Sequence, residues 1–464
     1  MSAPQTLATT PGVTVSGTLR TLIGLSWPIV LARATQSVIG FTDALFVAPL
    51  GETALAAVTT GSLNSWSAIV MPTGAVFIVQ SFVAQLRGRG ERAGVFRYAL
   101  YGLAIAAMAG LLALVSIPFI PSILGLFHYE PGVHAAMTKY LGIRLLSITA
   151  AVGIEALGNY YGGMGNTRPS MVAGIVAMSV NVLGCYALVM PRFGLPGYGV
   201  SGAAWASVLG SVAGFLTLAV PFGKEALAAR RVAPLGLRAK EFFRVLRFGV
   251  PNGLNWFLEF AAFIIFINAV VGHLGTRVLA AFNVVMQLNS VAFMPAFGLA
   301  SGGAILVGET IGKGRKDDVW PLVRMTAMVS AVWMLAVGAV YAVIPRYLMG
   351  FFQSGGVTTT ELVDVGTKML MFAVLWQLFD ALGMTLSEAL RAAGDTTWCM
   401  WARIVLAWGI FTPLGWAAVF LFHGGVGTIM TSLVIYMVGL SSALALRFAS
   451  GRWKSIELVE EPSV

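Results

Sequence analysis

Charged residues are scarce in this sequence. They make up 10% of its 464 residues, while hydrophobic residues make up 58%. A water-soluble domain carries about 25% charged residues, and a soluble chain of this length would fold into several domains that each need a polar surface. Because this chain has too little charge to cover such surfaces, its composition predicts a protein whose solvent is the lipid bilayer.

Cysteine is nearly absent as well. The two cysteines, Cys185 and Cys399, are too few and too far apart for a disulfide framework or a zinc site. The sequence contains no nucleophile–base pair or metal-ligand motif, so we expect neither an enzyme nor a resident cofactor. The net charge of +10 would suit nucleic acid, but the basic residues lie in short gaps between apolar stretches rather than on a soluble module. We therefore expect no nucleic-acid partner.

Long apolar stretches dominate the chain instead. A transmembrane helix needs roughly 20 mostly apolar residues, and about twelve stretches meet this requirement. Lipid-exposed backbone has to satisfy its own hydrogen bonds, which predicts helices, and the dyad alternation of an outer-membrane barrel is missing. The predicted spans are 21–47, 54–86, 95–119, 134–158, 168–190, 198–222, 247–272, 278–308, 320–345, 361–390, 397–421 and 425–448.

The distribution of the 29 Lys and Arg predicts the orientation of these spans. With the N-terminus inside, three basic residues lie in external loops: Arg192, Arg277 and Arg346. Four others lie within spans: Arg33, Lys139, Arg144 and Lys368. The remaining 22 fall in cytoplasmic segments, where we also count Arg391 and Arg403 near the inner ends of two spans. Basic residues are enriched in cytoplasmic loops, so both termini are expected in the cytoplasm.

The chain also repeats itself at an offset near 224 residues, which indicates an internal duplication. The matching segments are Leu50-Gly51 and Leu274-Gly275, Ala56-Ala57 and Ala280-Ala281, Gly88-Arg89-Gly90 and Gly312-Lys313-Gly314, Pro28 and Pro251, Pro72 and Pro295, and Gly165-Asn166-Thr167 and Gly394-Asp395-Thr396. Each match alone is weak, but their order is the same in both halves. Six spans in each half give the two halves the same orientation.

The duplication predicts an all-α polytopic membrane protein built from two pseudo-symmetric six-helix bundles. We expect a cytoplasmic tail without a cleavable signal over 1–20, a first lobe over 21–222, a basic cytoplasmic linker over 223–246, a second lobe over 247–449 and a cytoplasmic tail over 450–464. Transporters built from paired repeats bind substrate near the bilayer midplane, where the halves meet. The duplication therefore favours a transporter over a scaffold.

Several motifs carry a resemblance to a known family. In the first half they are Trp27-Pro28, Gly40-Phe41-Thr42-Asp43, Leu50-Gly51, Gly162-Gly163-Met164-Gly165-Asn166-Thr167-Arg168-Pro169 and Gly197-Tyr198-Gly199-Val200-Ser201-Gly202-Ala203-Ala204. In the second half they are Val250-Pro251, Glu259, Phe379-Asp380 and Arg391-Ala392-Ala393-Gly394-Asp395-Thr396. With these motifs the sequence resembles the multidrug and toxic compound extrusion (MATE) family, in its bacterial NorM-like branch, over essentially the whole chain.

The resemblance implies a V of two six-helix bundles, alternating access, and exchange of drugs for Na⁺ or H⁺ across a bacterial inner membrane. It places Asp43 at the family's first-span acid, and Glu259 and Asp380 at the acid pair of the second lobe. Two positions depart from the family's pattern. Ala48-Pro49 replaces the usual Gly-Arg, which points to an altered external loop, and Arg33 stands at a Gln-like position, which changes the electrostatics of the first lobe.

Acids inside the spans support a mechanism independently of the resemblance. A charged side chain at a helix centre costs about 2.5–3.5 kcal/mol on insertion scales, so such residues usually mark an ion or substrate path. Asp43, Glu259 and Asp380 are therefore predicted to couple transport to a cation. Their oxygens suit either Na⁺, with Glu259 and Asp380 as its ligands, or a proton. The alternative is that these acids are structural and only form hydrogen bonds.

Other polar residues in the spans have two readings. Five are candidate linings of a cavity for substrate or cation: Gln36, Asn181, Asn255, Asn283 and Gln287. Hydrogen bonding between helices is the alternative for them. We also expect Glu155 to pair with Arg144 or Arg168, and Glu388 to form an ion pair with Arg391 at the membrane interface.

Together these features predict a monomeric antiporter that exports small organic compounds, cationic or amphipathic, against inward Na⁺ or H⁺. The closest alternative is a flippase for lipid-linked oligosaccharides or another solute exporter of the same superfamily. Such flippases tend towards more spans and a cationic central cavity, whereas this chain has acids at the key positions.

Overall fold

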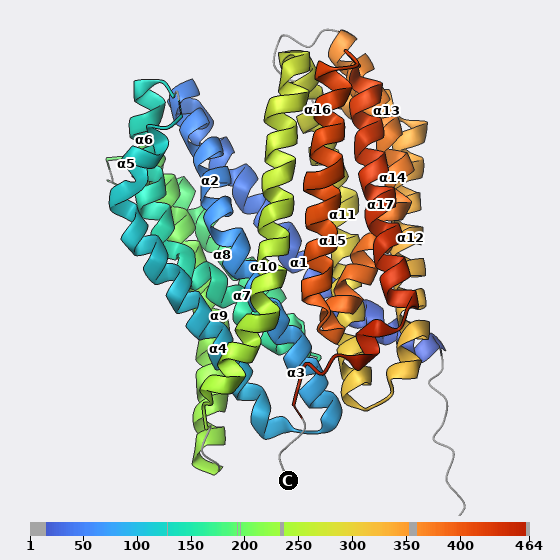
Figure 1. The fold of residues 1–464 in the computed structure, drawn as a ribbon. Helices are drawn as coiled ribbons and strands as arrows, with labels where there is room; N and C mark the ends of the chain where they lie inside the picture. Colours follow the sequence, from blue (N-terminus) through green and yellow to red (C-terminus); the bar gives the residue numbers. More distant parts are fainter. Residues whose placement is uncertain are drawn as a thin grey trace, which may run out of the picture.

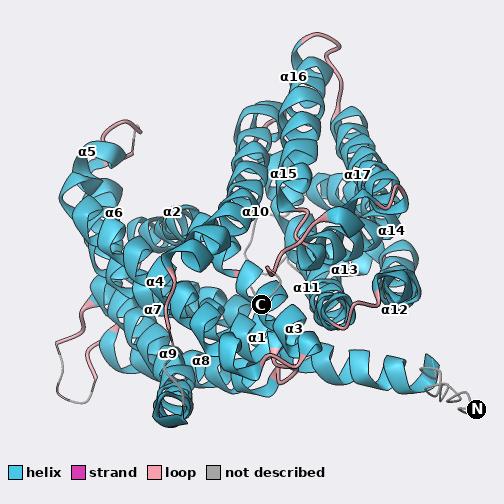
Figure 2. Ribbon diagram, turned by 60° about the horizontal axis from the view of Figure 1, so that its bottom comes forward, coloured by secondary structure: helices cyan, strands magenta, loops and turns pink. Residues whose placement is uncertain are grey.

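Helices make up most of the computed structural model, which describes residues 15–127, 129–192, 194, 196–232, 236–351 and 360–460. Figure 2 shows helices joined by short loops, and the described residues contain no strand. The first half contains α1 (Val15–Val47), α2 (Glu52–Val76), α3 (Ile78–Arg89), α4 (Arg92–Ser116), α5 (Ile120–Leu124), α6 (Pro131–Arg144), α7 (Ile148–Gly163), α8 (Arg168–Leu188) and α9 (Gly199–Val232). The second half contains α10 (Ala239–Ile265), π-helix η4 (Phe266–Val271), α11 (Thr276–Gly312), α12 (Val319–Val343), α13 (Pro345–Phe351), α14 (Thr360–Ala393), α15 (Thr396–Ile404), π-helix η7 (Val405–Phe411), α16 (Thr412–Phe420) and α17 (Val426–Ala449).

The predicted number of membrane spans is confirmed. In the described part of the chain, 12 helical segments are long and apolar enough to cross a membrane. They are Gly17–Leu50, Glu52–Arg89, Gly94–Leu124, Pro131–Gly163, Arg168–Leu188, Gly199–Ala228, Ala239–Leu274, Thr276–Gly312, Lys316–Val343, Glu361–Ala393, Thr396–Phe420 and Val426–Ala449. The range 223–246, expected as a linker, is largely helical, because α9 continues to Val232 and α10 starts at Ala239.

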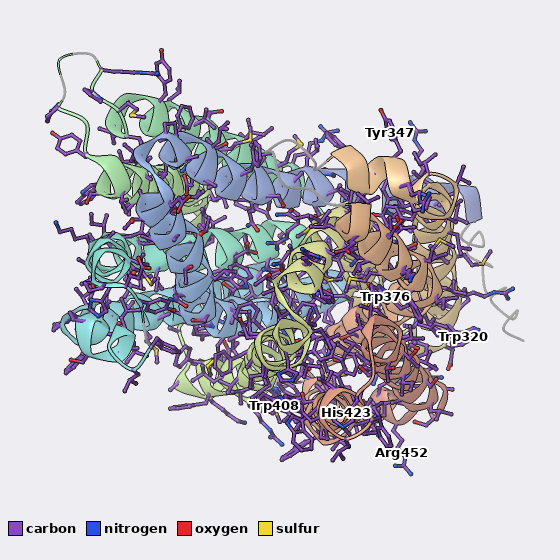
Figure 3. The ribbon with its side chains drawn as sticks, turned by 90° about the horizontal axis from the view of Figure 1, so that it is seen from above. Trp320, Tyr347, Trp376, Trp408, His423 and Arg452 are labelled. Atoms are coloured by element: carbon purple, nitrogen blue, oxygen red, sulfur yellow. The ribbon has the colours of Figure 1, made fainter. Side chains whose placement is uncertain are left out.

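The helices form two bundles, as the duplication predicts. Figure 1 shows the first half (blue to green) and the second half (yellow to red) lying close together at the end that carries the C-terminus and diverging towards the other end. Each bundle has its own apolar core, with Phe82 and Tyr140 in the first and Phe266 and Trp376 in the second. Trp376 lies inside the second bundle and is 1% exposed (Figure 3). Burial of such large side chains gives each bundle its own stabilising core.

The bundles contact each other along the first helices of each half. Helix α1 packs on α11, while α10 packs on α2, and α3 also packs on α11. A Cβ atom added at Gly74 of α2 would lie 2.8 Å from the Cα of Gly253 on α10, and one at Gly298 of α11 would lie 2.5 Å from Cγ2 of Val30 on α1. Small residues at these crossings let the helix backbones approach closely. Because the two crossings are equivalent in the duplicated halves, the interface is pseudo-symmetric.

Backbone angles at matching glycines also follow the duplication. Gly51 and Gly275, which precede the second helix of each half, have φ angles of 102° and 103°. Gly90 and Gly314, which end the following segment, have φ angles of 81° and 75°. Glycine adopts such positive φ angles without the steric cost that other residues meet. The repeated glycines therefore make the same turns in both halves.

The C-terminal strap, which we define as residues 451–460, joins the two bundles at the end where they converge (Figure 1). Its Trp453 stacks on Phe448 of α17, with ring centroids 5.2 Å apart. Its Leu458 and Val459 are buried in the core of the first bundle. Arg89 of α3 donates hydrogen bonds to the carbonyl oxygens of residues 459 and 460, at 3.0 and 2.9 Å. The strap is thus anchored on both halves.

Candidate functional site: buried charges in both bundles

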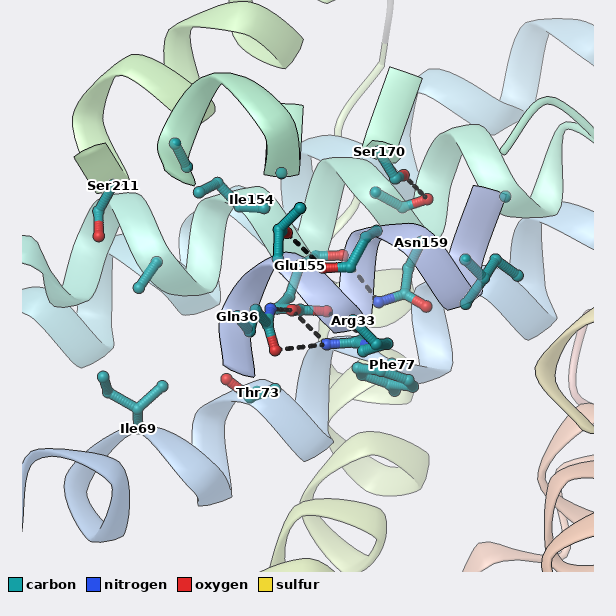
Figure 4. A pocket seen from close by; sticks show the side chains of 18 of the residues that line it. Arg33, Gln36, Ile69, Thr73, Phe77, Ile154, Glu155, Asn159, Ser170 and Ser211 are labelled. Atoms are coloured by element: carbon teal, nitrogen blue, oxygen red, sulfur yellow. Dashed lines mark hydrogen bonds and ion pairs between the residues drawn. The ribbon is translucent and has the colours of Figure 1, made fainter. Parts of the chain in front are cut away.

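A cavity of about 240 Å³ lies in the first bundle. Its walls come from seven helices of that bundle (α1, α2, α3, α6, α7, α8 and α9) and from Ser301 of α11. Apolar side chains such as Ile69 and Ile154 cover part of the wall, and Arg33, Gln36 and Glu155 gather in its middle (Figure 4). The charged residues in the lining are Arg33, Arg144 and Glu155.

Arg33 of α1 and Glu155 of α7 form a bidentate ion pair in this cavity. The Nη1–Oε1 and Nη2–Oε2 distances are both 2.8 Å, and the Gln36 amide donates to Glu155 Oε1 at 3.1 Å (Figure 4). The Arg33 guanidinium also lies 5.3 Å from the ring centroid of Phe77 and 5.6 Å from that of Phe297, within range of cation–π attraction. Arg33 is therefore neutralised within its own bundle.

The expected partner of Glu155 was wrong. The sequence predicts Arg144 or Arg168, which are nearer in the chain, but the fold brings α1 and α7 to the same cavity, where Arg33 is the partner. Arg144 forms no ion pair with any described residue. Its Nη1 bonds to Ser147 Oγ at 2.9 Å, whereas its buried Nε has no hydrogen-bond partner.

Asp43 of α1 lies in a neutral polar cluster of the first bundle. It is 3% exposed and accepts hydrogen bonds from Ser207 Oγ at 2.8 Å, Asn181 Nδ2 at 3.0 Å and Cys185 Sγ at 3.2 Å. No basic side chain among the described residues pairs with it. Neither Asp43 nor Asn181 lines the cavity. A charge on Asp43 would thus be held by neutral donors alone.

Glu259 of α10 pairs with a residue that the sequence interpretation had misplaced. Arg403 of α15 forms an ion pair with Glu259 Oε2, and Tyr436 of α17 donates to Oε1 at 3.1 Å. Arg403 is 13% exposed and lies within the span Thr396–Phe420, so counting it among the cytoplasmic residues was wrong. The Trp408 indole donates to the Leu258 carbonyl at 3.1 Å, which ties η7 to α10 beside this site (Figure 3).

Asp380 of α14 belongs to the same region. Glu259 and Arg403 are its charged neighbours, so the fold brings the two acids of the second half together. The Asp380 carboxylate is half-buried, and no described residue forms a hydrogen bond or an ion pair with it. Gln377, one turn earlier, is buried and its side-chain amide has no hydrogen-bond partner. The described residues contain no group of three or more His, Cys, Asp or Glu that could hold a metal ion.

The predicted lining residues fall into different places. Gln36 lines the cavity of the first bundle. Asn181 bonds to Asp43, and Asn255 is buried on α10 with its Oδ1 unpaired. Asn283 and Gln287 are exposed on α11. The five residues therefore do not form one lining.

Glu388 and Arg391 form the expected ion pair, and the fold buries it inside the protein, in the last turns of the span Glu361–Ala393. Their side chains are 7% and 3% exposed, and the Nη2–Oε2 distance is 2.5 Å. Arg391 also donates to the Phe77 carbonyl at 2.8 Å and to Gln80 Oε1 at 2.7 Å, both in the first half. The pair is buried because residues of the first bundle pack against it in the interface between the two bundles.

The family model described as MatE matches residues 28–187 and 251–417, one range in each bundle. This chain belongs to the MatE family. It is 28% identical over 459 residues to "Multidrug resistance protein PmpM" of Pseudomonas aeruginosa, covering 97% of this chain and 94% of that protein. It is 26% identical over 439 residues to "Probable multidrug resistance protein NorM" of Thermotoga maritima, covering 93% of this chain and 92% of that protein.

Solved structures of MatE proteins share the fold. "Outward-facing conformation of a multidrug resistance MATE family transporter of the MOP superfamily" has a TM-score of 0.83 at 18% identity, covering 94% of this chain and 95% of that one. "Crystal structure of MATE in the bent conformation" has a TM-score of 0.81 at 19% identity, covering 94% and 96%. The resemblance to the NorM-like MATE branch is confirmed, and the chain is a multi-pass membrane transporter rather than an enzyme.

Proposed function

We propose that this MatE protein exports small amphipathic organic compounds in exchange for an inward flow of Na⁺ or H⁺. One observation carries the proposal: Asp43 and Asp380 are intramembrane carboxyl groups with no basic side chain bonded to either. Removing an ionised carboxylate from water without a counter-charge is unfavourable. Such a group gains from binding a cation or proton, and releases it when water reaches it.

The two-bundle architecture supports alternating access. The first lobe (21–222) and the second lobe (247–449) would rock against each other, opening the space between them to one side of the membrane at a time. Cation binding from outside favours one arrangement, and substrate binding from inside favours the other. Entry of one charge down a potential of 100 mV releases about 2.3 kcal/mol, which suffices for a roughly fiftyfold gradient of a neutral substrate.

The Glu259–Arg403 pair favours H⁺ over Na⁺ as the coupling ion. A guanidinium stays charged at all physiological pH values, so Glu259 already has a permanent cation on one oxygen and the Tyr436 hydroxyl on the other. Sodium would then have mainly the oxygens of Asp380 as anionic ligands, close to a positive charge. A proton needs only one carboxylate, and Asp380 supplies it.

The positions of basic residues support an orientation with both termini in the cytoplasm of a bacterial inner membrane. Arg89, Arg244 and Lys316 all bond to the C-terminal strap. They gather at the end where the bundles converge, and basic residues are enriched on the cytoplasmic side. We propose that a single copy of the chain carries out transport, because each copy contains both bundles.

Everted membrane vesicles test the exporter directly. Addition of the cationic dye ethidium should discharge a preset pH or Na⁺ gradient, and the change Asp380→Asn combined with Asp43→Asn should reduce the discharge at least tenfold. The matched control is Asp364→Asn, which alters an exposed acid of α14 that pairs with Arg346. Undiminished discharge in the double variant would refute the role of these acids.

A further inference from the structure

Arg144 is an intramembrane arginine without an acidic partner among the described residues. It lies near the middle of the span Pro131–Gly163 and lines the cavity of the first bundle. Ionisable residues inside a membrane are costly; they almost always face a bundle interior or a cavity, and they usually pair with another group. Arg144 faces a cavity, as this pattern predicts, but no acidic group among the described residues is paired with it.

The charges that line the cavity leave one positive charge without a counterpart. Glu155 is already paired with Arg33 through two bonds of 2.8 Å, so it does not neutralise Arg144. A guanidinium does not lose its proton in proteins. Burial of an uncompensated charge is unfavourable, and the cavity therefore favours a ligand with an acidic group.

Two unused hydrogen-bond donors point to the same ligand chemistry. Arg144 Nε and Thr73 Oγ1 are both buried without a hydrogen-bond partner, and both residues line the cavity. A buried donor that is left unpaired costs the free energy of its desolvation. The two oxygens of a carboxylate can accept from such donors, and an arginine fork matches a carboxylate well.

The rest of the lining suits an apolar body of modest size. Trp66 and Phe77 supply aromatic surface, Ile69 and Ile154 supply aliphatic surface, and the cavity volume is about 240 Å³. Ligand sites are commonly lined by apolar and aromatic side chains, with a few polar groups that fix the orientation of the ligand. The cavity thus fits one bicyclic ring system or a short chain that carries a single charge.

We propose that the cavity of the first bundle binds amphipathic organic compounds through a carboxylate on Arg144, while the Arg33–Glu155 pair stays intact. This proposal names a substrate class for the proposed exporter, and so rests on it for transport. The proposed ligand is an anion, whereas the acids of the second bundle predict cationic substrates. Binding to the cavity can be measured without any ion gradient, however, so the two proposals can fail separately.

A matched pair of fluorescent probes tests the charge requirement. Dansylglycine carries a free carboxylate, and its methyl ester has the same ring system without the charge. In fluorescence titrations of the purified full-length protein, corrected for empty micelles, the acid should bind at least tenfold more tightly than the ester. The change Arg144→Gln should bring the two affinities within about twofold of each other, by removing the charge that recognises the acid.

The control variant is Lys368→Gln, which removes an exposed basic residue of α14 that does not line the cavity. It should keep the full preference for the acid. Equal affinity of the wild-type protein for acid and ester would overturn the proposal, as would an unchanged preference in the Arg144→Gln variant. If the Arg144→Gln variant fails to fold, two measurements still test the proposal. One is the comparison of acid and ester on the wild-type protein, and the other is the change Thr73→Val, which should weaken binding of the acid several-fold. A preference for the acid without any gradient-driven exchange would leave the cavity site standing and refute only the exporter.

Discussion

Arg403 changes what the second-bundle acids can do. Its side chain reaches Glu259 from α15, while Tyr436 reaches the other carboxylate oxygen from α17. Asp380 has no described partner of its own and lies near both charges. With Glu259 and Arg403 cancelling each other, the charge of this site depends on Asp380. The site is therefore neutral when Asp380 is protonated and carries one negative charge when it is not.

Replacement of Arg403 by glutamine should create a sodium site. Glu259 and Asp380 would then be neighbouring acids without a fixed cation, and carboxylate oxygens are good ligands for hard cations. A ligand at concentration c that binds only the folded state stabilises it by RT ln(1 + c/Kd), and so raises the melting temperature once its concentration exceeds Kd. In detergent, 100 mM NaCl should therefore raise the melting temperature of the Arg403→Gln variant by several degrees relative to choline chloride.

The wild-type protein and the charge-preserving variant Arg403→Lys should show no such shift. A sodium-dependent rise in the wild-type melting temperature would contradict this account of the site. So would a glutamine variant that folds normally and ignores sodium. In both cases the guanidinium would not be the group that excludes the metal ion.

Some residues of the site could be predicted from the sequence and others could not. Asp43, Glu259 and Asp380 could be singled out because a carboxylate inside an apolar stretch is visible in a local window. Arg403 was missed although it also lies inside an apolar stretch, since its place near the edge of a span made a cytoplasmic position plausible. The partner of Glu155 could not be found, because Arg33 lies 122 residues away and only the packed bundle brings them together.

At the scale of elements, the C-terminal strap contacts both bundles, a link that the sequence did not predict. The sequence predicted only a cytoplasmic tail over 450–464, since the ten residues of the strap are too few and too mixed to show a period. Arg244 of α10 donates to the Leu458 carbonyl at 2.7 Å, and Lys240 lies 3.2 Å from Glu460 Oε1. The hydrogen bond from Lys240 lowers the pKa of Glu460 below its usual value. This contact is therefore retained at neutral pH and lost only as the pH falls through that lowered pKa.

Placing a charge at Leu458 should release the strap. Leu458 is 1% exposed within the first-bundle core, and an aspartate there would bury a carboxylate among apolar side chains. Release should open the junction between α3 and α11 more often, so a cysteine at Ala84, now 0% exposed, should react about tenfold faster with a maleimide in everted vesicles.

The change Glu457→Gln serves as the control, since it alters an exposed side chain of the same strap. It should leave the reaction rate of the cysteine at Ala84 unchanged. An equally slow reaction in the Leu458→Asp variant would mean that the strap does not hold the bundles together, and that its contacts only cover the end of the molecule.

At the scale of the whole molecule, the matched spans explain why the general architecture could be predicted. Hydropathy is a local property, so twelve spans and their duplication are visible before any tertiary contact is known. The packing of α1 on α11 and of α10 on α2 between the bundles is not visible in this way, because it depends on helix crossings in space. Figure 1 shows the two bundles close together at the end that carries the C-terminus, while the ribbons diverge at the other end.

The alternating access that we propose requires this closed end to separate during each transport cycle. A disulfide across it should therefore stop export. A Cβ atom at Gly308 of α11 would lie 2.8 Å from the Cβ atom of Ala84 on α3, close enough for a disulfide after a small adjustment. Oxidation of a protein with cysteines at Gly308 and Ala84 should reduce dye export at least tenfold, and dithiothreitol should restore it.

A disulfide within one bundle provides the matched control. A Cβ atom at Gly102 of α4 would lie 3.1 Å from the Cβ atom of Ala156 on α7, so cysteines at these positions are equally close but join helices of the same bundle. The natural cysteines, Cys185 and Cys399, are buried and unpaired, which keeps them away from the oxidant. Rigid-body rocking moves each bundle as a whole and leaves the distance between α4 and α7 unchanged. Oxidation of this control should therefore leave export within about twofold of its starting rate. Equal inhibition by both disulfides would instead mean that transport depends on motion inside the first bundle, and undiminished export with the bundles joined would rule out their separation at this end.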